Sequence, residues 1–302
     1  MKKLSVLLAI VLFTMASFAQ DITAYPTHWW AGMKNPNLQL MLRGTGIADQ
    51  IPQFKLPAAG VRMAEGVTLK AVHRVANPNY IFLDLQIAAN AKPGVKELKF
   101  PSGKTIRYEI KARNKENGKT RIRGVDAKDF IYLIMPDRFS NGDPSNDRVP
   151  GMRDQSLNRD TIFERHGGDL KGVQNKLPYL QDLGVTAIWL NPVIENDMPN
   201  RTEHGYAFTD HYRIDRRLGG EKAYHDLVND IHARGMKIIQ DAVYNHVGLE
   251  HFLFRDQPDS TWFHRWPKYT QTTYKEQTLF DPYASKADKL LMSDGWFVPS
   301  MP

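Results

Sequence analysis

Residues 130–135 read Phe-Ile-Tyr-Leu-Ile-Met, an unbroken apolar run that is typical of a strand buried on both faces of a parallel sheet. Two similar runs follow at residues 185–190 and 236–243. Between the runs, apolar residues recur at three- and four-residue spacing over residues 170–183 and 221–234, which predicts amphipathic helices that end at Gly184 and Gly235. Strands that alternate with helices predict an α/β fold with a parallel sheet.

The loops after these predicted strands are long. In a (β/α)₈ barrel, the loops at the carboxyl ends of the strands carry the active site. Asp241, Asn245 and His246 fall at the carboxyl end of the third predicted strand. That position indicates a catalytic or substrate-binding role, and the alternative is a helix cap beside a buried histidine.

The residues before this region follow a different pattern. Short alternating segments at 37–43, 67–72, 80–87 and 105–110 predict strands, and clusters of Gly, Pro and Asn separate them. We therefore expect an immunoglobulin-like β-sandwich over residues 20–115, a polar linker over 116–128 and an incomplete (β/α)₈ catalytic domain over 129–302. Trp29 and Trp30 of the sandwich are candidates for a ligand-stacking platform, and burial at the domain interface is the favoured interpretation.

The amino terminus predicts export. Lys2 and Lys3 precede a short apolar run, and Ser17 and Ala19 supply the small residues that signal peptidase requires. Residues 1–19 are therefore predicted to be a signal peptide, and the protein to be periplasmic or secreted. No other stretch is apolar enough to cross a membrane. The chain contains no cysteine, which excludes disulfides, thiol catalysis and a lipid-anchored cysteine.

The net charge of +7 is concentrated in one stretch of the 302-residue chain, because residues 92–123 hold eleven Lys or Arg against three acids. A nucleic-acid patch is one interpretation. No row of aromatic stacking residues accompanies the charges, so a solvated hairpin and linker is the favoured interpretation and no nucleic-acid partner is predicted.

The loop over residues 136–147 concentrates oxygen-bearing side chains. Asn141, Asp143, Asn146 and Asp147 lie within seven residues. Ca²⁺ takes six to eight oxygen ligands, often from flexible loops, although the same residues also form ordinary surface turns. A zinc site would need His204, His211, His246 and His251, which show no ligand pair at helical spacing.

Five segments together resemble the α-amylase superfamily, glycoside hydrolase family 13, and within it the neopullulanase and cyclomaltodextrinase branch. In chain order they are Asp137-Arg-Phe-Ser-Asn-Gly-Asp143, Gly167-Gly-Asp-Leu-Lys-Gly172, Gly184-Val-Thr-Ala-Ile-Trp-Leu-Asn-Pro192, His204-Gly-Tyr-Ala-Phe-Thr-Asp210 and Asp241-Ala-Val-Tyr-Asn-His246. An N-terminal β-sandwich is also typical of this branch.

The resemblance implies roles for particular residues. It places Gly167, through its carbonyl, and Asp169 beside the four loop residues as ligands of one structural Ca²⁺ ion. It also implies that Tyr206 stacks on a sugar ring, that His246 binds a hydroxyl of the same sugar, that Asp241 orients the nucleophile's surroundings and that Asn245 supports the loop. The implied partners are an α-glucan and a second copy of the chain, which would dimerise through the N-terminal domain.

The catalytic carboxylates that the resemblance implies match no position in this sequence. In this family the nucleophile follows the fourth strand and the acid follows the fifth, whereas the motifs stop at the third strand and an irregular, protruding third-loop subdomain. A complete barrel takes ~250 residues, more than the chain leaves after a leader and a sandwich. We therefore expect a full-length enzyme that hydrolyses α-1,4 bonds of maltodextrins, cyclodextrins or pullulan with retention, and cleavage of α-1,6 bonds stays open. This chain alone is expected to be inactive, and the alternatives are a non-catalytic glucan-binding module and a truncated gene product.

Overall fold

The computed structural model describes residues 22–51, 56–57, 60–100, 102–116, 124–272, 280–293 and 295–302. The predicted signal peptide and residues 117–123 of the predicted linker lie outside the described residues. The chain divides into two compact units, one of Met1–Arg74 and Pro78–Ala112 and one of Val75–Asn77 and Arg113–Pro302.

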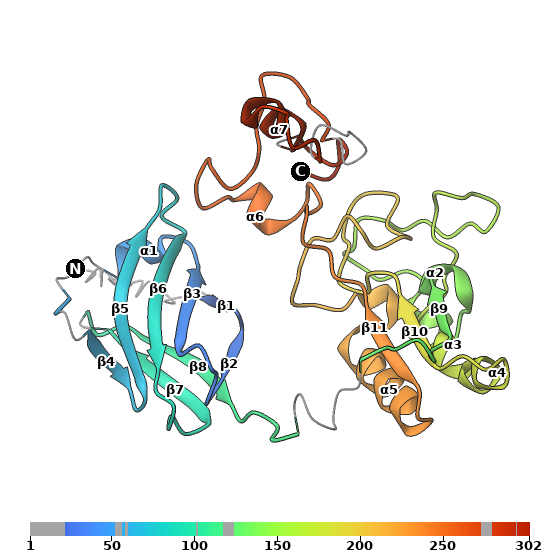
Figure 1. Ribbon diagram of the computed structural model, residues 1–302, viewed down its shortest axis with the longest axis horizontal. Coiled ribbons are helices and arrows are strands. Elements are labelled where there is room, and N and C mark those ends of the chain that lie inside the picture. The colour runs from blue at the N-terminus through green and yellow to red at the C-terminus, as the bar shows by residue number, and fades with distance from the viewer. Residues whose placement is uncertain are drawn as a thin grey trace, which may run out of the picture. The chain divides into compact units, whose positions relative to one another are not determined.

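The first unit is built from two β-sheets. The order in the larger sheet is β1-β3-β6-β5-β4, with all neighbours antiparallel, and the order in the smaller sheet is β2-β8-β7, in which β2 runs parallel to β8 (Figure 1). The strands and the one short helix are β1 (Thr23–Tyr25), β2 (His28–Trp30), β3 (Asn37–Arg43), α1 (Ile47–Gln50), β4 (Val61–Ala64), β5 (Val67–Arg74), β6 (Tyr80–Ile87), β7 (Gly94–Lys99) and β8 (Thr105–Lys111).

One apolar core joins these two sheets. Alternate residues of β3 and β8, such as Leu38, Leu40, Ile106 and Ile110, are buried in the same cluster, while Gln39, Arg107 and Glu109 between them are exposed. This period-two burial is what the alternating sequence pattern predicts for a sheet with one covered face. Trp29 is half-buried and packs against the same core.

The second unit is centred on a three-stranded parallel sheet of order β11-β10-β9. Ala187 of β10 pairs with Ile131 of β9 and with Lys237 of β11, so the three strands are in register. Its elements are β9 (Ile131–Ile134), α2 (Pro136–Phe139), the 3-10 helix η1 (Pro144–Asn146), α3 (Leu170–Asn175), α4 (Leu177–Asp182), β10 (Ala187–Leu190), η2 (Arg216–Leu218), α5 (Gly220–Ala233), β11 (Lys237–Gln240), α6 (Phe252–Arg255) and α7 (Lys286–Ser293).

The predicted helix over residues 170–183 is two helices in the structure. α3 ends and α4 begins at Lys176, two residues before Pro178. Proline has no backbone N–H and cannot continue the i to i−4 hydrogen-bond ladder, so the break is local chemistry that overrides the apolar periodicity. The leucines of both helices still reach one core, which they share with α5 and the sheet.

The predicted burial on both faces is seen on one face only in the part of the chain that the structure describes. Helices α3, α4 and α5 cover one face, whereas Ile131, Leu133 and Trp189 on the other face are 42%, 57% and 39% exposed. The sheet therefore presents an apolar face that no described element covers fully.

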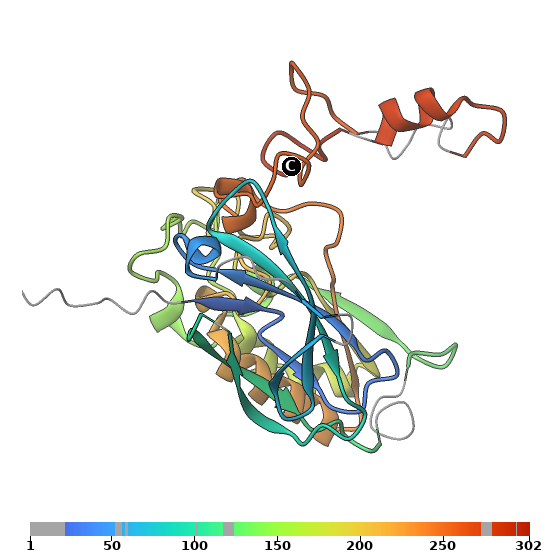
Figure 2. The same ribbon diagram turned by 90° about the vertical axis from the view of Figure 1, so that its left-hand side faces the viewer.

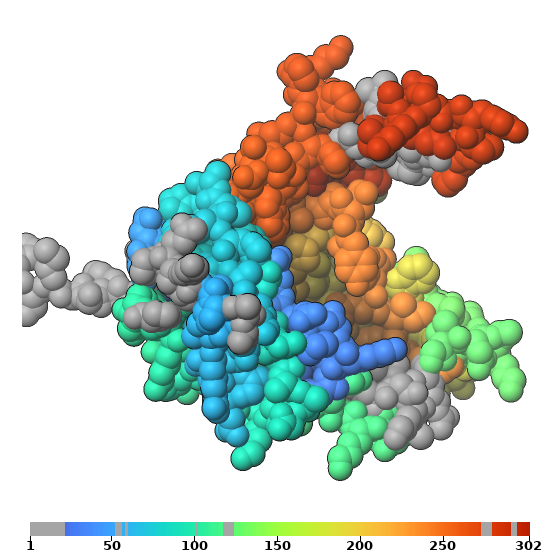
Figure 3. All heavy atoms as spheres, turned by 60° about the vertical axis from the view of Figure 1, so that its left-hand side comes forward, coloured from blue at the N-terminus to red at the C-terminus, as the bar shows by residue number. Residues whose placement is uncertain are grey.

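The chain after β11 leaves the carboxyl end of the sheet and carries α6 and α7 (Figure 2). Figure 3 shows this orange and red segment overhanging the part of the unit that is coloured yellow to green, with an open hollow between them. None of the described helices has the length and apolar content needed to cross a bilayer.

Candidate active site

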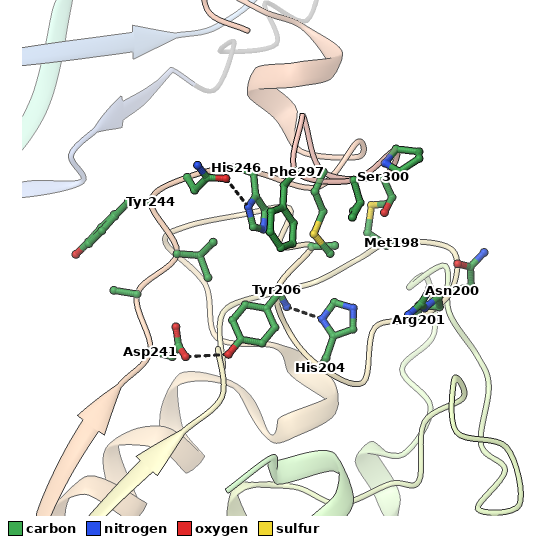
Figure 4. A pocket seen from close by; sticks show the side chains of 17 residues that line it. Met198, Asn200, Arg201, His204, Tyr206, Asp241, Tyr244, His246, Phe297 and Ser300 are labelled. Carbon is green, nitrogen blue, oxygen red and sulfur yellow. Dashed lines mark hydrogen bonds between the residues drawn. The ribbon is translucent and has the colours of Figure 1, made fainter. Parts of the chain in front are cut away.

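A cavity of about 840 Å³ lies beyond the carboxyl ends of β10 and β11 (Figure 4). Three segments that are distant in sequence line it: the loop after β10, the residues directly after β11 and the last residues of the chain. The lining residues are Met198, Asn200, Arg201, His204, Tyr206, Ala207, Asp241, Ala242, Val243, Tyr244, Asn245, His246, Phe297, Val298, Pro299, Ser300 and Met301. All four predicted substrate-binding residues are among them.

Tyr206 and Asp241 lie side by side in the lining of this cavity (Figure 4). The Tyr206 hydroxyl donates a hydrogen bond of 3.0 Å to Oδ2 of Asp241, the first residue after β11. Burial and the neighbouring Asp241 carboxylate raise the pKa of the Tyr206 phenol above its usual value of 10. The phenol therefore stays protonated, and the site offers a flat apolar ring with a polar edge.

His204 holds the backbone of Tyr206 in place. Its Nδ1 accepts a hydrogen bond of 2.9 Å from the Tyr206 backbone N–H, and the two rings stack with centroids 5.8 Å apart. Burial, together with the positive charges of Arg201 and His246, lowers the pKa of His204 to about 4. His204 is thus neutral at pH 7, and the hydrogen bond places its proton on Nε2. The sequence analysis named His204 only within the segment that resembles the family and as a candidate zinc ligand. It did not predict that His204 supports Tyr206.

His246 forms another wall of the cavity. Its ring stacks on Phe297 with centroids 4.8 Å apart and planes 7° from parallel, and its Nδ1 lies 3.1 Å from Asn245 Oδ1. Burial lowers its pKa below 6.5. The buried Nε2 has no hydrogen-bond partner among the described residues, so a ligand hydroxyl could pair with it. Phe297 was not predicted, because nothing local in the sequence connects it to His246.

A buried ion pair shapes the loop that presents His204 and Tyr206. Arg217 Nη2 lies 2.8 Å from Asp215 Oδ2 and donates to the carbonyl of Asn196 at 2.6 Å, and all three residues are buried. Although burial alone would raise the pKa of Asp215, the Arg217 guanidinium brings it below its usual value. Removing one partner of such a pair leaves an uncompensated buried charge, so the loop is rigidly held.

The six predicted calcium ligands lie together between the loop after β9 and the start of α3. Asp169, which is fully buried, is at the centre. Its carboxylate accepts hydrogen bonds from the backbone N–H groups of Gly142, Asp143 and Gly172 at 3.1, 2.8 and 2.5 Å, and from Asn146 Nδ2 at 3.3 Å. This carboxylate joins the loop to the first turn of α3.

Several oxygen atoms at this cluster lack partners. Asn141 Nδ2 donates to Asp147 Oδ1 at 2.7 Å, whereas Oδ1 of Asn141 and Oδ1 of Asn146 are buried with no hydrogen-bond partner among the described residues. Burial, and secondarily the charge of Asp169, raises the pKa of the Asp147 carboxyl. Two neighbouring carboxylates with unpaired buried amide oxygens are an environment that suits a hard cation.

Two of the six residues have distinct roles. Gly167 adopts φ +81°, and a Cβ there would lie 2.7 Å from Asp147 Oδ1, so only glycine fits against the cluster. Asp143 is exposed, and its carboxylate accepts hydrogen bonds from the backbone N–H and hydroxyl of Ser145, which lower its pKa. The structure thus shows the Asp143 side chain as a cap of η1.

The structure does not bring the four histidines of the zinc alternative together. His251 Nε2 lies 2.9 Å from His211 Nδ1, whereas His204 and His246 line the large cavity. In the part of the chain that the structure describes, no three His, Cys, Asp or Glu side chains are grouped to hold a metal. That finding does not test the calcium prediction, because the predicted calcium ligands also include the side-chain amide oxygens of Asn141 and Asn146 and the carbonyl oxygen of Gly167.

Comparison with known proteins agrees with this architecture. Residues 133–290 match the family described as "Alpha amylase, catalytic domain", and residues 24–114 match "Cyclomaltodextrinase, N-terminal". The chain therefore belongs to the α-amylase family. Within it, the chain falls in the branch of neopullulanase- and cyclomaltodextrinase-like proteins, which confirms the resemblance predicted from the motifs.

Three curated relatives illustrate the similarity. Neopullulanase 2 of Thermoactinomyces vulgaris is 45% identical over 130 residues, covering 42% of this chain and 21% of the relative. Cyclomaltodextrinase of Thermoanaerobacter pseudethanolicus is 40% identical over 127 residues, covering 42% and 21%. Periplasmic alpha-amylase of Escherichia coli is 32% identical over 189 residues, covering 55% and 28%. The matches thus span between about a fifth and a little over a quarter of each relative.

Proposed function

We propose that this chain is part of an exported enzyme that hydrolyses α-glucosidic bonds of maltodextrins, cyclodextrins or pullulan with retention of configuration. The observation that carries the proposal is the cavity at the carboxyl ends of β10 and β11, where Tyr206 and Asp241 meet. This is the end of a parallel α/β sheet at which such folds place their ligands. The names of two relatives, neopullulanase and cyclomaltodextrinase, describe enzymes that act on glucans, and this supports the same substrate class here.

The lining of the cavity suits a neutral sugar. The apolar face of a pyranose packs on a rigid aromatic ring such as Tyr206, while the phenol and Asp241 offer polar contacts at its edge. His204 and His246 have pKa values lowered by burial and are uncharged at neutral pH, so they would pair with hydroxyl groups and not with anions. Asn245, which also lines the cavity, supports the His246 ring through its Oδ1, 3.1 Å from His246 Nδ1.

We assign no catalytic residue in this chain. Retention requires a nucleophilic carboxylate and a carboxylic acid that flank the bond, and the positions that carry them in the family match nothing in this sequence. We therefore propose that residues 129–302 supply the sugar-binding side of the site, and that the 302-residue chain by itself binds glucan without hydrolysing it. A glucan-binding module is the second candidate function. Binding without hydrolysis by this chain is expected for both candidates, and hydrolysis by a longer chain that continues in frame would distinguish the enzyme from the module.

We also propose a finer description of the fold. The first unit would be an immunoglobulin-like sandwich, and the three parallel strands would be the first part of a (β/α)₈ barrel. The exposed apolar face at Ile131, Leu133 and Trp189 supports this proposal, because the inward side chains of a barrel are apolar and packed in layers. Addition of further parallel strands would bury this face.

A structural Ca²⁺ site is a further part of the proposal. Asn141, Asn146, Asp147 and Asp169 would hold the ion by side-chain oxygens, Gly167 by its carbonyl, and Asp143 from the edge of the cluster. The unpaired buried oxygens of Asn141 and Asn146 support this assignment. When bound, the ion would neutralise the neighbouring carboxylates and join the loop after β9 to α3, without contact with the sugar.

Export and self-association are proposed from the sequence and its relatives. The predicted signal peptide and the name of the periplasmic relative support a periplasmic or secreted protein. A homodimer through the N-terminal domain is proposed from the resemblance alone. Cell fractionation tests the first proposal, and light scattering of the chain with and without residues 20–115 tests the second.

Isothermal titration with maltoheptaose, followed by an assay for reducing ends, tests the main proposal. We expect the 302-residue chain to bind maltoheptaose, to lose about tenfold or more in affinity with Tyr206→Ala, and to release no reducing ends. The matched control is Tyr179→Ala, because Tyr179 is exposed on α4. Absence of binding would refute the proposed glucan function, and hydrolysis by the chain alone would refute the assignment of no catalytic residue.

A further inference from the structure

A second, smaller cavity lies in the segment that follows α6. Its volume is about 290 Å³, and its lining residues are Arg265, Trp266, Lys268, Tyr269, Thr270 and Trp296. None of these belongs to the predicted sugar or calcium sites. Three of the six are aromatic, two are cationic, and none carries a carboxylate.

Backbone hydrogen bonds hold the position of Trp296 at the wall of this cavity. Its N–H donates to the carbonyl of Thr270 at 2.9 Å, and its own carbonyl accepts from the N–H of Thr272 at 2.8 Å. The indole Nε1–H donates to the carbonyl of His264 at 2.6 Å. The ring is therefore pre-organised, and little conformational entropy would be lost when a ligand packs against it.

The aromatic rings of the cavity remain accessible. Trp266 is 36% exposed and Tyr269 is 47% exposed, and the Tyr269 ring lies 6.3 Å from Trp296 at 70°. Exposed aromatic rings that sit close together on a polar segment are typical of binding surfaces. Their flat faces suit the apolar face of a pyranose ring.

The polar groups at the rim are mostly donors. Arg265 donates to Gln257 Oε1 at 3.2 Å and lies 5.8 Å from the centre of the Phe254 ring, so its guanidinium is held in position. Lys268 and Thr270 line the same cavity, and the Thr270 hydroxyl donates to the carbonyl of Lys268 at 3.3 Å. The N–H donors of Arg265 and Lys268 suit the hydroxyl oxygens of a sugar, and an anionic ligand would use the same charges without needing the rings.

Two consecutive residues contribute to the two cavities. Trp296 lines the smaller cavity, and the next residue, Phe297, lines the larger one and stacks on His246. One peptide unit therefore connects the wall of one cavity to the wall of the other.

From these observations we propose that the cavity at Trp266, Tyr269 and Trp296 is an accessory α-glucan-binding site. It would bind one or two glucose units of a chain whose reacting part occupies the larger cavity. This inference rests on the proposed glucan function of the larger cavity and names a second contact for the same substrate.

The test compares affinities for maltoheptaose by isothermal titration with the 302-residue chain. We expect Trp266→Ala and Tyr269→Ala each to raise the Kd about three- to tenfold, as loss of one aromatic contact predicts. The affinity for maltose, which is too short to reach both cavities, should fall much less. The matched control is Tyr283→Ala, because Tyr283 is exposed and lines neither cavity.

The outcomes separate this inference from the proposed function. Loss of binding with Tyr206→Ala but unchanged binding with Trp266→Ala and Tyr269→Ala would overturn the accessory site and leave the proposed function standing. Absence of maltoheptaose binding by the unmodified chain would overturn both. Affinity that falls steeply with added NaCl would show an ionic site and overturn the sugar assignment.

A second measurement needs no substitution. Hydrogen exchange of the unmodified chain, with and without saturating maltoheptaose, reports on the backbone around Thr270 and Trp296. Protection of residues 265–272 on addition of the sugar is expected. Protection confined to residues 198–207 and 241–246 would contradict the accessory site.

Discussion

The Tyr206 hydroxyl donates a 3.0 Å hydrogen bond to the carboxylate of Asp241, which joins the long loop after β10 to the first residue after β11. The two residues are 35 positions apart in sequence. Their contact places an aromatic ring and a carboxylate next to each other in the lining of one cavity.

Replacement of Tyr206 by phenylalanine should separate the two roles of this residue. Tyr206→Phe keeps the ring but removes the hydrogen bond to Asp241, so we expect a loss of about threefold or less in affinity for maltoheptaose. Tyr206→Ala removes the ring as well and should cost about tenfold or more, in line with the contribution of an aromatic contact plus its buried area. Equal losses in the two variants, measured by titration calorimetry, would mean that the hydroxyl and not the ring binds the sugar.

Acidification should destabilise the second unit between pH 6.5 and pH 4. The pKa of His204 is about 4 in the folded chain against 6.5 as its ordinary value, and burial also lowers the pKa values of His211 and His246. The unfolded state therefore binds more protons in this range, so the free energy of unfolding falls as the pH falls. For His204 the loss amounts to ~3 kcal/mol below pH 4.

Urea denaturation at several pH values measures this dependence. His204→Asn removes the titrating group and should flatten the decline in unfolding free energy over this range. The control is Asn90→Ala, because Asn90 lies at an exposed turn of the first unit and carries no titrating group, so the slope should stay unchanged. A slope that His204→Asn does not alter would contradict the assignment of a buried neutral His204.

Calcium should raise the melting temperature of the chain, and chelation should reverse the effect. A ligand that binds only the folded state at about one hundred times its Kd stabilises it by ~2.7 kcal/mol. Asn141→Ala removes one of the unpaired buried oxygens and should abolish most of the shift. Asn90→Ala, at an exposed turn of the first unit, is the control that should keep it. Melting curves that do not respond to calcium or to chelation would refute the site.

Gly172 should be intolerant of any side chain. A Cβ at this position would lie 1.8 Å from the carbonyl oxygen of Ser140, so Gly172→Ala must push α3 away from the loop that holds the calcium cluster. We expect a loss of about 1–3 kcal/mol or more in the free energy of unfolding. Gly124→Ala is the matched control, since a Cβ there would meet nothing within 4 Å. Equal stability of the two variants, measured by thermal denaturation, would contradict the packing of α3 against this loop.

Much of the local structure could be predicted because its causes are local. The strand predicted over residues 80–87 is β6, and the helix predicted over 221–234 is α5 with a shift of one residue at each end. Gly235 adopts φ +73° after α5, as a glycine that ends a helix does. Period-two and period-3.6 patterns report which face of an element is apolar, and that information lies within one element.

The contacts of the candidate site depend on residues that are distant in sequence. The stacking of Phe297 on His246 joins positions 51 apart, and the cavity at Trp296 combines it with residues 265–270. No periodicity encodes such pairs, because they arise only when the loops pack. The sequence by itself predicted β3, β5, β6 and β8 of the first unit, the three parallel strands and α5 of the second, the family, and candidate residues for sugar and calcium; it did not predict β1, β2, β4 or β7. Only the tertiary structure decided that His204 supports Tyr206, that one apolar face of the described sheet is exposed, and that the consecutive residues Trp296 and Phe297 line two different cavities. The physical reason is that burial and stacking between loops depend on their arrangement in space, which local patterns do not specify.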